Sequence, residues 1–360
     1  MSGSDKPLVS VLTPVYNGES FLQDCIESVL TQTYEKYEYI IVNNCSTDRT
    51  LEIALSYAAK DSRIRVHTNT QFVGVIENHN IAFDLISPTA KYCKVVSADD
   101  FIFPDCIRQM VGFAENNPSV GILGSYQLSG RYIKWQGFPY PRNVFSGAEV
   151  CRYFFFLDEV FVEGEPILGF GTPTSMLYRA DLIRESRGHF YPNSSPHADT
   201  SACCKYLQGS NFGFIYQVLS YERRHGATQT SKSRQMNRYL SAALNDLIEY
   251  GPYYLNKEEL EVQVSKALRA YHQFLAVSYF SGVRDKEFWD YHRNRLQELG
   301  YPLRRGTLPK AAFRKVLEEL SSPEQAIKKV WSLVVRKRRD NGIATAQPGL
   351  LKSNDASTLR

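Results

Sequence analysis

Two adjacent carboxylates, Asp99 and Asp100, follow an apolar run, Tyr92–Ser97, that is typical of a buried strand. Neighbouring carboxylates at a strand end are costly unless a cation or donor hydrogens meet them. Their oxygen atoms suit Mg²⁺ or Mn²⁺, and such an ion would neutralise the charge of a diphosphate ligand. The pair therefore predicts a metal site. The alternative is that these residues cap a helix starting near Pro104.

Polar residues also follow the earlier strands of the expected fold. The first hundred residues alternate short apolar runs with helical patterns, which predicts successive βαβ units and a largely parallel sheet. Expected strands are Leu8–Thr13, Tyr37–Val42, Ile64–Thr68 and Tyr92–Ser97, with helices at Gly18–Leu30, Asp48–Ala59 and Val75–Ile86. Ligands of open α/β sheets bind at the carboxyl ends of the strands. The loops carrying Asn17, Asn43–Asn44 and Asp99–Asp100 are therefore candidate binding loops.

The later part of the chain changes character near residue 230. Strands are expected at Val120–Leu128, Ser175–Tyr178 and Phe214–Tyr221, with helices at Pro104–Asn117, Ala148–Leu157 and Ala198–Leu207. The pattern is then helical, at Met236–Tyr250, Lys257–Phe280, Lys286–Leu299, Lys310–Leu320 and Pro323–Arg339. We expect a domain of residues 1–230, a helical region of residues 231–340 and a disordered tail of residues 341–360.

Composition narrows the possible classes of protein. The 360 residues are 43% hydrophobic with a net charge of +4, which indicates a well-filled core and argues against a nucleic-acid binder with a broad basic surface. Seven scattered cysteines suggest neither a zinc site nor a disulfide framework. The N-terminus lacks the pattern of a signal peptide and no long apolar run predicts a membrane span, so we expect a cytoplasmic protein.

Three motifs occur in a specific order, namely Thr13–Glu19, Val42–Asp48 and Ser97–Asp100. Together they resemble the nucleotide-binding half of glycosyltransferase family 2, clearly over residues 8–130 and more weakly to about residue 230. This resemblance implies a GT-A fold, which is a Rossmann-like α/β fold with a mostly parallel sheet flanked by helices, here with a C-terminal helical extension. It also implies an inverting enzyme that uses a nucleotide-sugar donor.

The resemblance gives roles to the residues of the first and third motifs. It assigns Asp100 to the metal, Mn²⁺ or Mg²⁺, and Asp99 to the ribose or sugar of the donor. Tyr16 is expected to stack on or flank the base, and Pro14 to lie where backbone contacts to the base are made. Asn17 belongs to the same nucleotide-sugar site and turns the chain into the first helix. The family usually has an acidic residue where this chain has Ser97.

The second motif departs from the family. The family usually carries paired aspartates after the second strand, the second of which accepts a hydrogen bond from the base, whereas this chain has Asn43 and Asn44. The carbonyl oxygen of Asn44 can still accept from the imide N–H of a uracil, although without charge, and its amide can donate to another base. Alternatively the segment is an ordinary Asx turn that caps the next helix at Ser46 or Thr47.

Further along the chain, Asp199 lies where the family places its catalytic base. An alanine, Ala198, stands where the family often has a glutamate. Taken by itself, Asp199 also suits the N-cap of a helix. After the last expected strand, Arg224 is expected to bind the diphosphate and His225 to be an extra metal ligand. The alternative for both is a solvated strand end.

The motifs and the family resemblance together predict an inverting, hexosyltransferase-type glycosyltransferase. A UDP-sugar is the favoured donor and a glycan or lipid-linked hydroxyl the acceptor, in the synthesis of a cell-surface polysaccharide. The departures at Asn43–Asn44 and Ala198 keep open a catalytically inactive module that binds a nucleotide sugar or carbohydrate. A nicotinamide-dependent dehydrogenase is disfavoured because no G-x-G-x-x-G follows the first strand.

The C-terminal helical region ends in an apolar segment with a tryptophan, Ala326–Val335, followed by the basic cluster Arg336–Arg339. Such a segment suits a helix lying on an anionic membrane, as peripheral contact with its inner face would require. A helix packed on the rest of the protein with a solvated charged end is the equal alternative.

Overall fold

The structure is a computed structural model that describes residues 6–135, 138–156, 161–162, 165–166, 169–193, 195, 197–224, 236–282 and 284–321. The chain forms two compact units. Unit 1 comprises Met1–Leu268 and Glu287–Pro302, and unit 2 comprises Arg269–Lys286 and Leu303–Arg360. The predicted domain boundaries at residues 230 and 340 stay predictions.

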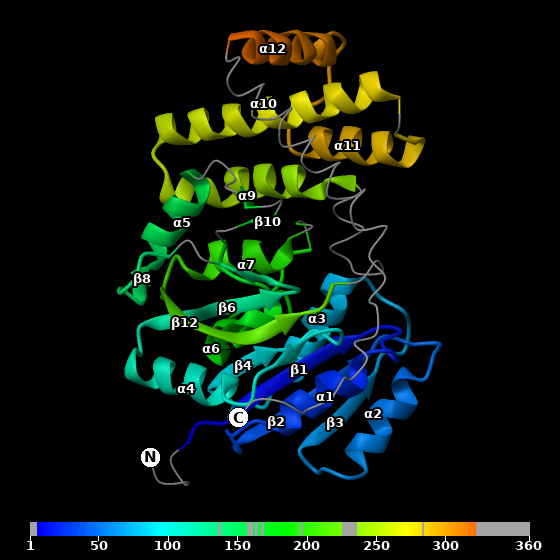
Figure 1. The fold of residues 1–360 in the computed structure, drawn as a ribbon, viewed down its shortest axis with the longest axis vertical. Coiled ribbons are helices and arrows are strands. Elements are labelled where there is room, and N and C mark those ends of the chain that lie inside the picture. The colour runs from blue at the N-terminus through cyan, green and yellow to red at the C-terminus, as the bar shows by residue number, and fades with distance from the viewer. Residues whose placement is uncertain are drawn as a thin grey trace, which may run out of the picture. The chain divides into compact units, whose positions relative to one another are not determined.

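A mixed β-sheet forms the centre of unit 1 (Figure 1). Its strands are β1 Val9–Val15, β2 Tyr37–Asn43, β3 Ile64–Thr68, β4 Tyr92–Val95, β5 Phe101–Ile102, β6 Val120–Ser129, β7 Tyr132–Lys134, β8 Val144–Ser146, β11 Met176–Arg179 and β12 Asn211–Glu222. They follow the order β3-β2-β1-β4-β11-β6-β12-β5, with β7 on β6 and β8 on β12. The strands β1 to β4 are parallel, whereas β11 runs antiparallel to β4 and β6. Two short strands, β9 Phe161–Val162 and β10 Glu165–Pro166, pair separately.

Helices cover both faces of this sheet, because its central strands are apolar on both sides. The helices are α1 Leu22–Leu30, α2 Thr50–Ala58, α3 Val75–Asp84, α4 Cys106–Asn116, α5 Gly147–Phe156, α6 Ala180–Glu185, α7 Ala198–Tyr206, α9 Arg238–Tyr254, α10 Lys257–Ser281, α11 Lys286–Glu298 and α12 Thr307–Ser321, with a 3₁₀ turn η1 at Pro173–Ser175. On β1, Val11 packs in the core that α1 and α4 share, and Leu12 packs in the core that α3, α7 and α9 share. The predicted α/β architecture is confirmed.

Two helices begin later than the sequence pattern predicts. Helix α1 begins at Leu22 rather than Gly18, because the backbone N–H of Gly18 donates to Thr50 Oγ1 at 2.7 Å. Helix α2 begins at Thr50, whose backbone N–H donates to Asp48 Oδ1 at 3.0 Å. The expected capping by Ser46 or Thr47 is therefore wrong. The bond from Gly18 to Thr50 ties the loop after β1 to the segment after β2, at the carboxyl edge of the sheet.

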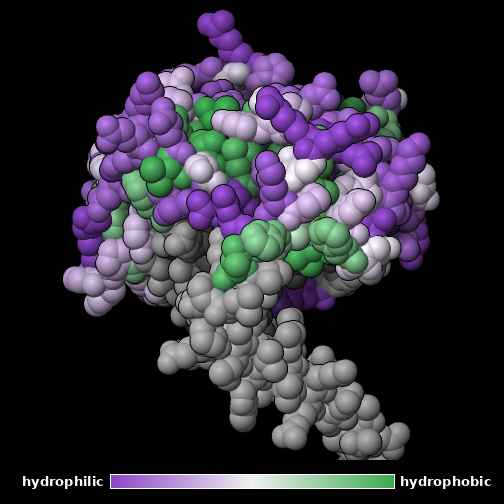
Figure 2. All heavy atoms as spheres, turned by 90° about the horizontal axis from the view of Figure 1, so that it is seen from above, coloured by the Kyte–Doolittle hydropathy of each residue, from purple (hydrophilic) through white to green (hydrophobic). Residues whose placement is uncertain are grey.

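The C-terminal part is helical in the residues described, as α9, α10, α11 and α12 show. The predicted helix Pro323–Arg339 and the tail of residues 341–360 lie outside the described residues. No helix in the described part of the chain is long and apolar enough to cross a membrane. Within unit 2 several apolar side chains are exposed, at Val277, Tyr279, Phe280, Phe313 and Leu317. Figure 2 shows hydrophobic residues between hydrophilic ones on the face that it presents.

Candidate active site

The loop after β4 carries the two predicted metal-binding carboxylates. Asp100 is only 5% exposed; its Oδ2 accepts a hydrogen bond from Thr174 Oγ1 at 2.7 Å. Its Oδ1 accepts from the backbone N–H of Arg223 at 3.1 Å. The Arg223 guanidinium in turn donates from Nε to the backbone carbonyl of Asp99 at 3.1 Å. Three segments that are distant in sequence, the β4 loop, η1 and the end of β12, therefore hold this carboxylate pair.

The electrostatics of this pair favour a cation. Burial first, and then the charge of Asp99, raise the pKa of Asp100 to about 8, while the hydrogen bonds from Thr174 and Arg223 oppose that rise. Because a nearby cation favours the charged form of a carboxyl group, a divalent ion would relieve this cost.

The donor set fits Mg²⁺ or Mn²⁺. Mg²⁺ usually binds proteins through one or two carboxylates, with water and substrate phosphates as its other ligands. Asp99 and Asp100 supply such carboxylates. Among the residues that the structure describes, no group of three or more His, Cys, Asp or Glu side chains could hold a metal by itself. The site is thus suited to an ion that arrives with, or is completed by, a diphosphate.

The end of β12 places Arg224 against the hairpin of β6 and β7. Its Nε donates to Ser129 Oγ at 2.9 Å, and its guanidinium lies 5.4 Å from the ring centroid of Tyr132. Since the neighbouring Arg223 contacts Asp100, Arg224 lies near the carboxylate pair. His225 lies outside the described residues, so its role as a metal ligand stays a prediction.

An exposed aromatic pair lies at the carboxyl edge of the sheet. Tyr16 follows β1 and is 48% exposed; its ring meets that of Phe72 edge to face, with centroids 4.8 Å apart. Phe72, in the loop after β3, is 61% exposed. Pro14 is buried in β1 opposite Val42 of β2. Phe72 was absent from the sequence prediction, although an aromatic residue in a loop at this edge is a usable signal.

Asn17 joins the first two loops. It adopts a left-handed conformation with φ of 50°, in which asparagine is favoured. Its backbone N–H donates to Ser46 Oγ at 3.0 Å, and its Oδ1 accepts from the backbone N–H of Thr47 at 2.8 Å. The side chain of Asn17 thus stabilises the loop geometry, and direct contact with a donor stays a prediction.

Asn44 is buried and bonded to the loop after β3. Its Oδ1 accepts from Asn69 Nδ2 at 3.0 Å and from the backbone N–H of Val73 at 3.0 Å, and its Nδ2 donates to the carbonyl of Val73 at 2.8 Å. Both lone pairs of this amide oxygen are therefore used within the protein. In this structure Asn44 holds the loop that carries Phe72, and a hydrogen bond from its side chain to a base stays a prediction.

Asp199 lies in the first turn of α7. The N-cap of this helix is His197, so Asp199 does not occupy the capping position. Asp199 is partly buried, its Oδ1 accepts from the backbone N–H of Thr200 at 2.9 Å, and burial raises its pKa. Its charge also contributes to raising the pKa of the buried phenol of Tyr191.

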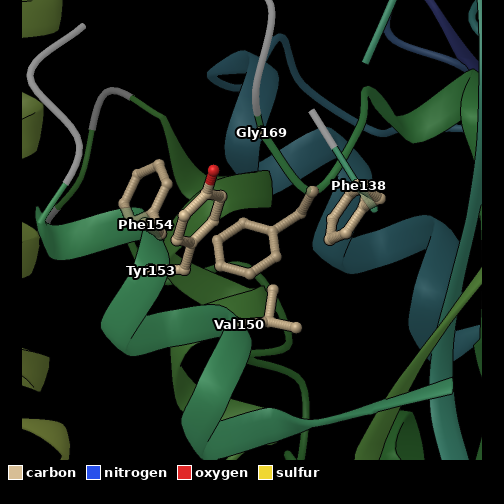
Figure 3. A pocket seen from close by; sticks show the side chains of 6 residues that line it. Phe138, Val150, Tyr153, Phe154 and Gly169 are labelled. Atoms are coloured by element: carbon tan, nitrogen blue, oxygen red, sulfur yellow. The ribbon is translucent and has the colours of Figure 1, made fainter. Parts of the chain in front are cut away.

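The glycine-rich segment Gly169–Gly171 leads into η1 and β11. Gly171 has a φ of 137°, and a Cβ there would lie 2.5 Å from Ser175 Oγ, so the turn requires glycine. Beside it lies a small pocket (Figure 3). Aromatic and apolar residues line this pocket, namely Phe138, Val150, Tyr153, Phe154, Gly169 and Phe170. The surroundings of this segment are therefore apolar and aromatic, in contrast to the polar β4 loop.

Comparison with known proteins places this geometry in a family. The model of glycosyl transferase family 2 matches residues 10–187, about half of the chain. An uncharacterized glycosyltransferase of Haemophilus influenzae is 26% identical over 279 residues, which cover 74% of this chain and 81% of that protein. Glycosyltransferase GlyG of Streptococcus pneumoniae is 24% identical over 279 residues, covering 74% of this chain and 89% of that protein.

Solved structures support the fold. The crystal structure of residues 1–349 of S. aureus TarS in complex with UDP-GlcNAc is similar, with a TM-score of 0.59 and 18% identity, over 81% of this chain and 80% of that one. At this identity the likeness shows a shared GT-A fold. The family match and the named relatives show that this chain belongs to glycosyltransferase family 2 and that the protein is a glycosyltransferase.

Proposed function

We propose that the protein transfers a sugar from a nucleotide-diphosphate sugar to a hydroxyl group of a glycan or lipid-linked acceptor, with inversion at the anomeric carbon. The observation that carries this proposal is the buried carboxylate of Asp100, beside Asp99 at the carboxyl edge of the sheet and held there by η1 and the end of β12. Ligands of α/β sheets bind at this edge.

In this proposal Asp99 and Asp100 face the diphosphate end of the donor. Asp100 would hold Mn²⁺ or Mg²⁺, and Asp99 would contact the ribose or sugar. When bound, the ion supplies positive charge against the charge that develops on the leaving diphosphate. Arg224 contributes a guanidinium on the same side, which suits a phosphate oxygen. Its contacts with Ser129 and Tyr132, next to Arg223, support this role.

The base of the donor is proposed to lie against Tyr16 and Phe72. Both rings are exposed and already in contact, so one base can pack against them without a large rearrangement. Asn44 would act mainly by holding the loop of Phe72 through its three hydrogen bonds. A UDP-sugar is favoured as donor. The similarly folded TarS was crystallised with UDP-GlcNAc, which supports testing that class first.

Asp199 is proposed to be the general base. The hydroxyl oxygen of the acceptor attacks the anomeric carbon, its proton passes to the carboxylate of Asp199, and the bond from the anomeric carbon to the diphosphate oxygen breaks. Asp99 and Asp100 cannot take this proton if they lie with the leaving phosphates. The raised pKa of Asp199 suits a group that must hold a proton after attack.

A screen of nucleotide sugars tests the donor class. Thermal unfolding of the full chain would be followed with UDP-, GDP- and dTDP-sugars, each with and without Mn²⁺. A UDP-sugar should raise the unfolding temperature most, and Mn²⁺ should increase that effect. Slow release of free sugar from the stabilising donor would distinguish an enzyme from an inactive binding module. Equal stabilisation by all donors without Mn²⁺ dependence would contradict both the UDP preference and the metal role.

The acceptor side of the proposal concerns the membrane. A lipid-linked acceptor of cell-surface polysaccharide synthesis would lie at a membrane, and residues 326–339, outside the described part, combine apolar residues with a basic cluster. A chain shortened after Pro323 should hydrolyse donor normally and sediment less with anionic lipid vesicles. Equal sedimentation of both chains would remove this support for peripheral membrane contact.

A further inference from the structure

A lysine is fully buried in the central strand β4. Lys94 has 0% exposure, although β4 lies between β1 and β11 in the middle of the sheet. Because side chains alternate along a strand, Lys94 points to the same face as Tyr92 and Val96, which pack in the core shared with α1 and α4. An ammonium group in such surroundings is costly unless acceptors meet it. We therefore expect Lys94 to have a specific function at this position.

The ammonium of Lys94 is directed at the turn before β11. Its Nζ donates to the backbone carbonyl of Thr174 and, at 2.9 Å, to the backbone carbonyl of Met176. These two carbonyls lie at η1 and at the first residue of β11. Burial lowers the pKa of Lys94, whereas nearby Cys106, Cys93 and Asp100 raise it. Lys94 thus fixes the backbone of this turn and lies close enough to Asp100 to interact with its charge.

The same turn holds the candidate metal ligand. The hydroxyl of Thr174 is 2.7 Å from Asp100 Oδ2, and it accepts from the backbone N–H of Ser97 at 3.0 Å. Lys94 therefore contacts the main chain of the residue whose side chain contacts Asp100. A displacement of the turn would move the Thr174 hydroxyl away from the carboxylate.

We propose that Lys94 is a positioning residue of the donor and metal site, which fixes the η1 turn so that Thr174 holds the Asp100 carboxylate for a divalent cation. This inference rests on the proposed function for its metal. A methionine would fill the same space and would need no hydrogen-bond acceptors. Packing alone therefore does not require a lysine here.

Binding of Mn²⁺ to the full chain tests the proposal. The variants are Lys94→Met, Thr174→Val and the two together, and Lys91→Met is the matched control. Lys91 loses the same charge, but its side chain is 54% exposed and pairs with Glu115 at the surface. Lys94→Met should weaken Mn²⁺ binding by roughly 10-fold or more, as loss of a group that orients a metal ligand does. Lys91→Met should leave it unchanged.

The double variant shows whether Lys94 acts through the turn. If it does, the double variant should lose no more Mn²⁺ affinity than the single variant that binds Mn²⁺ more weakly, because both changes remove the same support of Asp100. Full additivity of the two losses, or normal Mn²⁺ binding by Lys94→Met, would overturn the proposal. Should Lys94→Met not fold, Lys94→Gln replaces it as the test variant, because glutamine keeps a hydrogen-bond donor without charge. Lys94→Gln should also weaken Mn²⁺ binding, and Lys91→Met should not.

Hydrogen exchange of the metal-free protein separates this inference from the proposed function. Lys94→Met should speed exchange in the peptides of residues 172–176 and 97–100, with little change elsewhere. If wild type and Asp100→Asn bind Mn²⁺ equally, the metal role of Asp100 fails, yet local exchange still tests the positioning. Uniformly faster exchange over the whole sheet would instead show that Lys94 only stabilises the fold, and would refute its specific role.

Discussion

The buried carboxyl group of Asp246 makes the stability of unit 1 depend on pH in a predictable way. Asp246 lies on α9 with 1% exposure, and Ser201 Oγ of α7 donates to its Oδ1 at 2.5 Å. Burial raises its pKa from the ordinary 3.8 to about 7, against the effect of the hydrogen bonds from Ser201 and Asn245. The folded state therefore favours the protonated form of this side chain.

The sign and size of the effect follow from this difference. A carboxyl group with a raised pKa in the folded state contributes stability that is complete below the ordinary pKa and is lost as the pH rises through the folded value. For Asp246 that window runs from about pH 4 to about pH 7. A difference of about 3 pKa units corresponds to roughly 4 kcal/mol as an upper bound. This is a large part of the 5–15 kcal/mol that is typical of a folded domain.

Asp246→Asn removes the titration while keeping shape and an oxygen acceptor for Ser201. Between pH 5 and pH 8, which spans about two of these three units, the free energy of unfolding of this variant should rise by up to about 3 kcal/mol relative to wild type. Urea unfolding followed by fluorescence at pH 5, 6, 7 and 8 measures the difference, in which titrating groups that do not interact with Asp246 cancel. Asp290→Asn, at an exposed position of α11, is the control and should show no such trend. A difference between Asp246→Asn and wild type that is independent of pH would refute the reasoning.

Three further predictions concern the site. Because the pKa of Asp100 is raised to about 8, binding of Mn²⁺ at neutral pH should release a proton, and Mn²⁺ affinity should fall as the pH falls. Calorimetry in buffers of different ionisation enthalpy should detect that proton in wild type and not in Asp100→Asn. Asp199→Asn should keep fold and donor binding but lower turnover by roughly 10²-fold or more, and the wild-type product should have inverted configuration; near-normal turnover or a retained product would contradict this. Tyr16→Ala and Phe72→Ala should each weaken UDP binding by roughly 10-fold in a titration, with unchanged affinity speaking against the base site.

The sequence predicts the central sheet well and the contacts of its loops poorly. The strands β2 and β3 begin at the predicted residues. β2 is largely apolar and buried, whereas in the edge strand β3 apolar and polar residues alternate, and both patterns are typical of strands. The helix α6 and the strands β7 and β8 were not predicted, since elements of three to six residues carry little periodic signal. In the same way Asp100 was recognised as a candidate ligand, but its partner Thr174 lies 74 residues away and no local pattern reveals that contact.

The role of Asn44 also depends on loop contacts that the sequence pattern does not reveal. Its residue type is compatible with a base contact, an Asx turn or a loop bridge, and only the three-dimensional placement of Val73 selects among these for the folded chain. Lys94 gave no signal as a site residue, because a single lysine in an apolar run resembles a strand end that faces solvent. Both examples depend on residues that are distant in sequence.

The hydrogen bonds between α7, α5 and α9 have a consequence for work with shortened chains. Tyr254 of α9 donates from its hydroxyl to the carbonyl of Cys204 in α7 at 2.6 Å, and its own carbonyl accepts from Arg152 of α5. Leu247 and Tyr250 belong to the same core as Phe155. A recombinant fragment that stops at the end of the family match, residue 187, or at residue 230 would leave this apolar surface uncovered. We expect such fragments to aggregate on expression, whereas a fragment that retains α9 keeps the helix of Asp199 covered.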